Sequence, residues 1–248
     1  MPSMCKARYR ARFADDARDL RAAQALRHRC FRKGNGVDSD RFDDLCRHVL
    51  VDDATSGQLA ACFRLFPLAE GHQIHDSYSA QFYDLTALGQ LKAPMVEVGR
   101  FCIDPEAKDG VEALRVAWGS IARYVDEQGI AMLFGCSTFH GTDPIQYRDA
   151  FAVLHDRHMA PKRWRPRIKA PHVIRFSQDT DHVPDLKRAA QTMPPLLRSY
   201  LVMGGGVSDH AVVDRDLDTL HVFTGVEVNA VPPARARLLR ALAGAQAG

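Results

Sequence analysis

The nonapeptide Met95-Val96-Glu97-Val98-Gly99-Arg100-Phe101-Cys102-Ile103 is the point from which the architecture of this chain can be read. Its apolar run predicts a strand, interrupted by an acid and a base. Side chains alternate between the faces of a strand, so a regular strand would point Glu97 and Arg100 in opposite directions. A β-bulge at Gly99 would turn both toward one cavity and leave a backbone N–H near Phe101 available to an oxyanion. The stretch indicates a site that positions two substrates and needs no cofactor.

The length and composition are typical of a globular protein with one substantial domain. The 248 residues, 46% of them hydrophobic and 25% charged, suffice for one substantial core. We expect a single domain with a core over residues 8–178 and a C-terminal extension over residues 179–248. The net charge of +3 is too small to argue for a nucleic-acid partner, and none is expected.

The positive charge is concentrated in one segment, residues 157–178, which holds seven lysines and arginines and no acid. Such a segment attracts an acidic protein surface, anionic lipid or nucleic acid, although a solvated basic face is equally compatible with it. The seven residues are Arg157, Lys162, Arg163, Arg165, Arg167, Lys169 and Arg175.

The cysteines and histidines do not follow a disulfide or zinc pattern. The six cysteines, Cys5 among them, are scattered without a C-x-x-C pair, and His155 and His158 have no carboxylate at a recognised metal spacing. No apolar run approaches the ~18 residues of a spanning helix. We therefore expect a cytoplasmic protein without a metal, whose contact with the inner membrane, if any, is peripheral.

A helix is predicted from the N-cap candidates Asp15 and Asp16 to about Phe31. Arg27 lies on its apolar stripe, and a buried arginine needs carboxylate partners. The loop that follows, residues 33–44, supplies Asp38, Asp40, Asp43 and Asp44. Two interpretations stay open: an ion pair that holds the loop to the helix, or a polar wall for a charged substrate.

The rest of the pattern alternates between strands and helices. Arg64 interrupts one apolar face of a long strand, and a turn at residues 55–57 precedes that strand. The order predicts a mixed α/β (α+β) fold, with a mostly antiparallel central sheet flanked by helices. Strands are expected at 48–52, 58–68, 95–103, 130–136, 172–176, 211–214 and 220–228, and helices at 112–128, 147–158, 192–203 and the C-terminus.

Four sequence blocks, taken in this order of elements, resemble the GCN5-related N-acyltransferase (GNAT) fold and, within it, acyl-homoserine-lactone synthases. The blocks are Leu26-Arg27-His28-Arg29-Cys30-Phe31, Asp40-Arg41-Phe42-Asp43, Cys62-Phe63-Arg64-Leu65 and Glu97-Val98-Gly99-Arg100-Phe101. The positions that match the active-site wall of that family are Arg27, Phe31, Asp40, Asp43, Arg64, Glu97 and Arg100. The tryptophan that follows the first helix in those synthases, and that helps to hold their sulfonium substrate, is absent from this chain.

The sequence is more similar to the sister family of L-ornithine N-alpha-acyltransferases, over about residues 18–228. The similar blocks are Leu133-Phe134-Gly135-Cys136, Phe139-His140-Gly141-Thr142-Asp143, Met159-Ala160-Pro161, Met193-Pro194-Pro195-Leu196-Leu197 and Asp214-Arg215-Asp216. This resemblance implies transfer of a 3-hydroxyacyl chain from acyl carrier protein to the α-amine of L-ornithine. The product would be lyso-ornithine lipid, in the first step of ornithine lipid synthesis.

The place where ordinary GNAT enzymes bind the pyrophosphate of coenzyme A is acidic in this chain. It reads Glu106-Ala107-Lys108-Asp109-Gly110-Val111-Glu112, and its carboxylates would repel a pyrophosphate. The expected donor is therefore acyl carrier protein with its 4'-phosphopantetheine arm, as a co-substrate and without a bound cofactor. Carrier proteins are largely acidic, so the expected docking residues are Arg163, Arg165, Arg167 and Lys169 of the basic segment.

We assign roles to these residues from the chemistry of amide formation. Glu97 would accept the proton of the ammonium, directly or through water, and a backbone N–H between Gly99 and Phe101 would polarise the thioester carbonyl. Arg64 or Arg100 would bind the amino-acid carboxylate, and Asp40 or Asp43 the distal ammonium. Tyr147 or His140 could protonate the thiolate. The rival interpretation is that these charges form one structural ion network.

Three alternatives to this reaction stay open. Cys136, His140 and Asp143 could form a nucleophile with its base, but a buried cysteine is usually a small hydrophobe, and amines attack thioesters directly. A carrier-binding or membrane-recruiting module without turnover would explain the basic segment. The same chemistry on lysine or glutamine, or an acyl-homoserine-lactone-synthase-like reaction with S-adenosylmethionine, would use many of the same residues.

Overall fold

The computed structural model describes residues 8–32, 36–179 and 182–245. The chain forms two compact units. The first unit consists of Met1–Phe66, Val98–Gly129 and Pro233–Gly248, and the second of Pro67–Glu97 and Ile130–Pro232. Cys5 and the beginning of the predicted loop at Lys33 lie outside the described residues.

The sheet of the first unit contains β1, β2, β3 and β5 in that order, with β1–β2 and β2–β3 antiparallel. Its strands are β1 (Tyr9–Phe13), β2 (Arg47–Asp53), β3 (Leu59–Leu68) and β5 (Met95–Ile103), and its helices are α1 (Ala17–Phe31), α2 (Gly110–Glu127) and α6 (Pro233–Ala245). β5 also takes part in the second unit through its first three residues.

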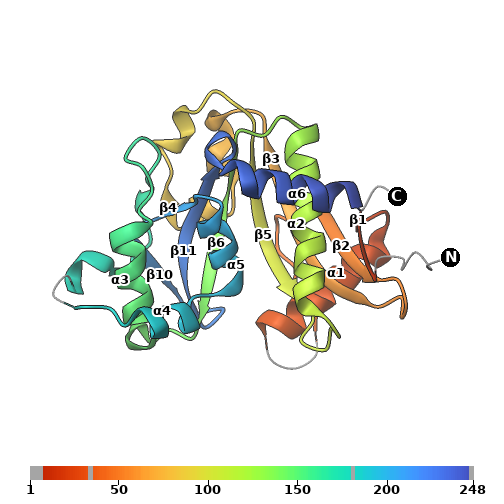
Figure 1. The fold of residues 1–248 in the computed structure, drawn as a ribbon, viewed down its shortest axis with the longest axis horizontal. Coiled ribbons are helices and arrows are strands. Elements are labelled where there is room, and N and C mark those ends of the chain that lie inside the picture. The colour runs from red at the N-terminus through yellow and green to blue at the C-terminus, as the bar shows by residue number, and fades with distance from the viewer. Residues whose placement is uncertain (1–7, 33–35, 180–181, 246–248) are drawn as a thin grey trace. The chain divides into compact units, whose positions relative to one another are not determined.

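Alternation along β3 places its side chains against different helices. Cys62 packs with Ala23 and Leu26 of α1, whereas Leu65 faces a pocket that it shares with residues of α2. α2 also packs against β1 and β2, and α6 crosses α2 (Figure 1). Arg64, two residues after Cys62, therefore lies on the same face of β3 as Cys62.

The sheet of the second unit follows the order β5-β6-β11-β10-β8, and β9 pairs with β11. The pairing of β5 with β6 is parallel, and those of β6 with β11, β11 with β10 and β10 with β8 are antiparallel. The strands are β6 (Met132–His140), β8 (Val173–Arg175), β9 (Gly206–Val207), β10 (His210–Asp214) and β11 (Thr219–Glu227), with a separate pair of β4 (Tyr83–Asp84) and β7 (Arg167–Ile168). The helices are α3 (Arg148–Arg157), α4 (Leu186–Thr192) and α5 (Pro195–Val202).

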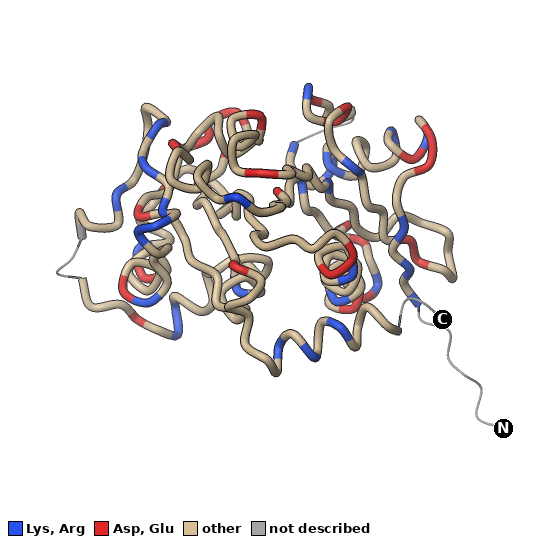
Figure 2. Tube along the Cα trace, turned by 90° about the horizontal axis from the view of Figure 1, so that it is seen from above, with Lys and Arg blue, Asp and Glu red and all other residues tan. Residues whose placement is uncertain are grey.

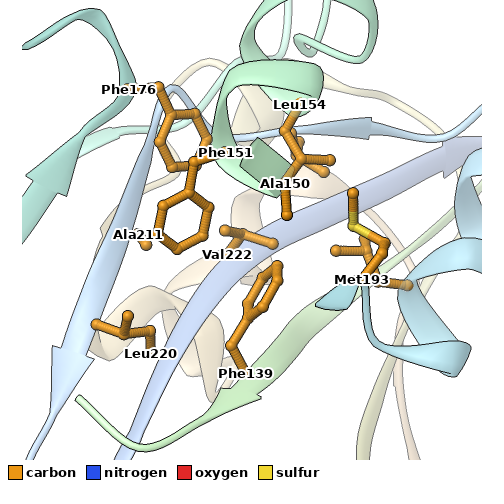
Figure 3. Close-up of a cluster of buried hydrophobic side chains, with 11 residues drawn as sticks. Phe139, Ala150, Phe151, Leu154, Phe176, Met193, Ala211, Leu220 and Val222 are labelled. Carbon is orange, nitrogen blue, oxygen red and sulfur yellow. The ribbon is translucent and has the colours of Figure 1, made fainter. Parts of the chain in front are cut away.

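An aromatic core joins the sheet of the second unit to α3 (Figure 3). The ring of Phe151 lies between those of Phe139 and Phe176, with centroid separations of 5.1 Å and 5.0 Å. Leu220 and Val222 of β11 are fully buried beside them. Such ring contacts add to the burial of apolar area, so this cluster fixes α3 on β6 and β11.

The structure confirms the mixed α/β class, the mostly antiparallel sheet and every helix and strand predicted above, with small shifts at their ends. Residues 95–103 form the predicted strand without any shift. The sequence did not predict β1, α4 or the two-residue strands β4, β7 and β9, because these segments are short and depend on their neighbours for pairing. In the part of the chain that the structure describes, no helix is long and apolar enough to cross a membrane.

Candidate active site

Arg27 is buried in the first unit and forms ion pairs with the loop that follows α1. Only 1% of its side chain is exposed, and it contacts Asp38 at 3.2 Å and Asp43 at 2.7 Å. A second donor of its guanidinium binds the backbone carbonyl of Asp38. These contacts confirm that the inward-facing arginine finds carboxylate partners in the loop.

Arg64 and Arg100 extend this set of charges. Arg64 binds Asp40 at 2.6 Å and Asp43 at 3.0 Å, and Arg100 binds Asp38 at 3.0 Å and Asp40 at 3.1 Å. We call the six side chains, in which three arginines meet three aspartates, the charge network of the first unit. Its members are Arg27, Arg64, Arg100, Asp38, Asp40 and Asp43.

The network holds its aspartates ionised. Burial alone would raise the pKa of Asp40, but the hydrogen bond from Arg64 and the charges of Arg64 and Arg100 hold that pKa below its ordinary value. Burial likewise opposes ionisation of Asp43, and the hydrogen bonds from Arg27 and Gln24 hold its pKa well below the ordinary value. The members differ in access: 22% of the Asp40 side chain and 11% of Arg100 are exposed, against 5% of Asp43 and 2% of Arg64. A small charged ligand can reach Asp40 and Arg100 most easily.

The backbone of β5 is irregular at Arg100, one residue after the predicted bulge position. Arg100 has a φ of +51°, in the left-handed region that a residue with a Cβ rarely adopts. Gly99 serves a different purpose: a Cβ there would lie 3.3 Å from Nε of Arg64. The glycine gives Arg64 room to pass, and the strained backbone of Arg100 directs its guanidinium to Asp38 and Asp40.

The two aromatic candidates of the first unit pack against apolar neighbours. Phe31 is half-buried against the cluster that contains Leu26 and Cys62. Phe101 is stacked on Phe63, with ring centroids 5.2 Å apart. Both rings therefore contribute packing within the first unit.

Glu97 is buried in the second unit. The segment that contains Tyr78 and Ser79 holds its carboxylate. Only 3% of the residue is exposed. The backbone N–H of Tyr78 donates to Oε2 at 2.8 Å, and Ser79 donates to Oε1 through its N–H at 2.7 Å and its hydroxyl at 2.5 Å. These donors favour the ionised carboxylate and fix its orientation.

The beginning of α2 offers little to a pyrophosphate. The side chain of Asp109 is the N-cap and accepts from the N–H of Glu112 at 2.9 Å, and Glu112 adds a second carboxylate to the first turn. A helix N-terminus binds anions through its unpaired N–H groups and its dipole, and here a carboxylate of the chain itself occupies that place.

The basic segment is partly engaged within the second unit. Arg163 pairs with Glu227 at 2.6 Å, Arg165 donates to the carbonyl of Ala160 at 2.7 Å, and Lys169 donates to that of Ala80 at 2.5 Å. Arg167 lies on β7 and is exposed, as is Lys162. Figure 2 shows lysines and arginines in blue and acidic residues in red along the whole trace. The exposed members are therefore better suited to a partner than Arg165, whose hydrogen bond stabilises its own loop.

The geometry does not support a cysteine nucleophile. Cys136 and His140 both lie on the extended strand β6, so four residues separate them by roughly 13 Å. Asp143 instead accepts hydrogen bonds from Ile145 at the start of a short helix. Tyr147 donates its hydroxyl to the carbonyl of His140 at 2.6 Å, and burial is the main cause that raises the pKa of Tyr147. Among the described residues, no cluster of three or more histidines, cysteines or acids could hold a metal ion.

Comparison with known proteins identifies the family. A family model described as an acetyltransferase (GNAT) domain matches residues 23–118. The L-ornithine N(alpha)-acyltransferase of Rhodobacter capsulatus is 33% identical over 239 residues, which cover 90% of this chain and 91% of that protein. The chain belongs to the L-ornithine N(alpha)-acyltransferase family. It is an acyltransferase, and the protein of the same name from Brucella abortus is 33% identical over 86% of this chain and 82% of that protein.

Solved structures agree with the fold. FeeM, an N-acyl amino acid synthase from uncultured soil microbes, aligns with a TM-score of 0.50 at 13% identity over 96% of this chain and 97% of that chain. TofI in an apo form aligns with a TM-score of 0.51 at 15% identity over 94% and 98%. At these identities the likeness shows the shared GNAT-like architecture alone.

Two contacts of the site were not predicted from the sequence. Asp38 was expected as one of four loop carboxylates that could pair with Arg27, and the structure confirms that pair, but its second pair, with Arg100, was not predicted. Ser79 reaches Glu97 from 18 residues away, and nothing in the sequence around it pointed to that contact.

Proposed function

We propose that this acyltransferase transfers a 3-hydroxyacyl chain from acyl carrier protein to the α-amine of L-ornithine. The observation that carries the proposal is the 33% identity to L-ornithine N(alpha)-acyltransferase over nine-tenths of both chains. The buried, hydrogen-bonded Glu97 and the charge network provide groups that suit such a reaction. The product would be lyso-ornithine lipid.

The nitrogen loses two protons in this reaction, and the sulfur gains one. The α-ammonium loses its first proton to Glu97, and the free amine attacks the thioester carbon, so that a C–N bond forms and the C–S bond breaks. The nitrogen then loses its second proton, the departing thiolate takes up one proton to become a thiol, and Glu97 releases the remaining proton to solvent. A backbone N–H near Gly99 and Phe101 would polarise the carbonyl, a contribution of about 3 kcal/mol where such donors have been removed from other enzymes.

The charge network would bind the amino acid. We assign the α-carboxylate to Arg100 and the distal ammonium to Asp40, because these two members are more exposed than Arg64 and Asp43. Arg27 and Asp43 form an ion pair with only 1% and 5% of their side chains exposed. We assign them the structural part of holding the network together. A distal ammonium would fit lysine as well as ornithine, whereas the neutral amide of glutamine would not compete for Asp40.

The donor is proposed to be a carrier protein rather than coenzyme A. This is supported by the acidic start of α2, where Asp109 caps the helix and Glu112 follows it. A phosphopantetheine arm carries one phosphate at its carrier end and needs no pyrophosphate cradle. The exposed Lys162 and Arg167 of the basic segment would face the acidic carrier.

The first test is turnover with a defined donor and three acceptors. The protein is incubated with 3-hydroxyacyl carrier protein and either ornithine, lysine or glutamine, and the released thiol is measured. We expect the highest kcat/KM for ornithine, and a loss of roughly 10²–10⁴-fold in kcat for Glu97→Gln. Full turnover by a folded Glu97→Gln variant would eliminate the base role. Equal rates with all three amino acids would eliminate the assignment of the ammonium to Asp40.

A second test addresses the donor surface. Lys162→Glu together with Arg167→Glu should raise the KM for the carrier protein and leave the KM for ornithine unchanged. Arg235→Glu together with Arg237→Glu, two exposed arginines on α6, is the matched control for the change in net charge. If the control raises the KM for the carrier as much as the double variant does, the basic segment is not the docking surface.

A further inference from the structure

Ser79 of the second unit contacts the proposed base, Glu97, through both its backbone and its side chain. Its side chain is fully buried, and its hydroxyl lies 2.5 Å from Oε1 of Glu97 and 3.4 Å from Sγ of Cys136. It belongs to a short turn of helix, Ser79–Gln81, and its N–H binds the same carboxylate oxygen. One residue thus donates twice to the carboxylate, once from a fixed group and once from a group that can rotate.

The hydroxyl of Ser79 can serve both forms of a base. A carboxylate that acts as a base becomes a carboxylic acid when it takes up a proton. Backbone N–H groups can only donate hydrogen bonds, so they stabilise the carboxylate alone. A hydroxyl can donate a hydrogen bond to the carboxylate and, after rotation, accept a hydrogen bond from the O–H of the carboxylic acid. The sulfur of Cys136 gives the rotated hydroxyl a second partner, in which either atom could donate.

We propose that Ser79 is a positioning residue for the acyl transfer: its hydroxyl orients the Glu97 carboxylate and sets the pH at which it takes up a proton. This inference rests on the proposed function, in which Glu97 is the base. Ser79 itself exchanges no atom with the substrate. It acts through Glu97, and the balance of the reaction is that given above.

One titratable group near this segment in the described part of the second unit also titrates in the acid range. It is His221, whose ring contacts Phe82 and whose pKa burial lowers to about 4. The other groups near the pair are Cys136, Tyr78, Tyr200 and Lys169, of kinds that ordinarily titrate above about pH 8. Burial and the charges of Cys136 and Glu97 raise the pKa of Tyr200 further. Ser79→Ala and Ser77→Ala both retain His221, so an acid limb that moves in Ser79→Ala alone is assigned to Glu97.

The test compares Ser79→Ala with Ser77→Ala. Ser77 is a buried serine of the same segment, with 1% exposed, whose hydroxyl donates to the carbonyl of Ile74 and accepts from the N–H of Ala80. Both variants lose a buried hydroxyl with its hydrogen bond, but only Ser79→Ala loses the contact with Glu97. For Ser79→Ala we expect kcat to fall roughly tenfold with little change in the KM for ornithine, and the acid limb of the rate profile to move up by roughly one pH unit. Ser77→Ala should lower stability without moving that limb.

A second measurement does not depend on activity. The chain has six glutamates, so the carboxyl carbons of labelled glutamate can be followed by NMR, with Glu97→Gln to assign the signal. Glu97 should titrate at higher pH in Ser79→Ala than in the unchanged protein and in Ser77→Ala. An identical titration in all three proteins overturns the inference, even if Glu97→Gln proves inactive. A different outcome is a shifted titration in Ser79→Ala together with full turnover by Glu97→Gln. It would overturn the base role of Glu97 but confirm that Ser79 sets the pH at which Glu97 takes up a proton. If Ser79→Ala does not fold, Ser79→Cys, with a weaker donor of similar size, is read in the same way.

Discussion

Asp43 in the first unit and Glu97 in the second are both buried carboxylates, with 6% and 3% of their surfaces exposed, but they are held in different ways. Asp43 binds the guanidinium groups of Arg27 and Arg64. Glu97 receives two backbone N–H groups and the hydroxyl of Ser79. A carboxylate between two arginines stays ionised and holds structure, whereas one with a rotatable hydroxyl as partner is suited to exchanging a proton. The two buried acids therefore have different tasks.

The largest effect is expected from breaking the charge network. Arg27→Ala leaves Asp38 and Asp43 buried with fewer partners, and such a loss typically costs about 3–5 kcal/mol of unfolding free energy. Urea denaturation followed by the fluorescence of Trp118, which lies on α2 of the first unit, measures it. Arg240→Ala is the control, because its pair with Asp126 is exposed. If both variants lose equally little stability, the network is not a structural centre of this unit.

The next effect concerns acid sensitivity, where the second unit should respond first. Burial, aided by the charge of His210, lowers the pKa of His221 to about 4, so the imidazole is neutral in the folded protein. The unfolded chain takes up this proton below about pH 6.5. The stabilisation is therefore complete above pH 6.5 and is lost as the pH falls toward 4, by about 3 kcal/mol in total. The pKa values of Asp40 and Asp43 are also lowered, so these carboxylates stay ionised to lower pH. The stability that the charge network provides is therefore lost at lower pH than that provided by His221.

His221→Phe isolates this contribution. Tyr83 keeps its 2.9 Å hydrogen bond to the backbone carbonyl of residue 221, so the variant removes the titrating ring without stranding that hydroxyl. Urea midpoints between pH 7 and pH 4 are read from Trp164 in a Trp118→Phe background, because the chain has one tryptophan in each unit. The variant should lose less stability on acidification than the unchanged protein. Parallel curves would show that His221 is not the group responsible.

A smaller effect is expected where Gly99 makes room for Arg64. Gly99→Ala places a methyl group 3.3 Å from Nε of Arg64, a side chain that ion pairs hold on two sides. Overpacking of this kind costs about 1–2 kcal/mol. We expect lower stability and a higher KM for the amino acid. Gly244→Ala, where a Cβ meets nothing within 4 Å, should cause neither change. A fully stable Gly99→Ala protein would mean that Arg64 moves aside freely.

The smallest effect separates the backbone of Arg100 from its side chain. Arg100→Gly and Arg100→Ala lose the same ion pairs with Asp38 and Asp40, but only glycine adopts a φ of +51° without strain. The glycine variant should be more stable than the alanine variant by about 1 kcal/mol in urea denaturation. An alanine variant of equal or greater stability would contradict the strain at this position.

Much of the fold could be predicted because it depends on local pattern. The strand 95–103 and the helix that ends at Phe31 follow from apolar periodicity and from the cap at Asp16, which accepts from Arg18 and Asp19. β1 was missed because it gains its pairing only from β2, whose residues lie about 40 positions away. Local pattern singled out Arg27, Arg64, Glu97, Arg100 and the loop aspartates, and the family resemblance matched them to an active-site wall. Individual contacts such as that of Arg100 with Asp38 could not be predicted in the same way.

The sequence by itself determined the order of the elements, the need of Arg27 for carboxylates and the acidic start of α2. These follow from periodicity, from the cost of a buried charge and from composition, all of which are properties of short segments. Only the tertiary structure decided which aspartate meets which arginine, that the strained residue of β5 is Arg100, and that Ser79 holds Glu97. The side-chain contacts among them join residues 11 to 62 positions apart, and the register of the strands and the path of the loops bring them together.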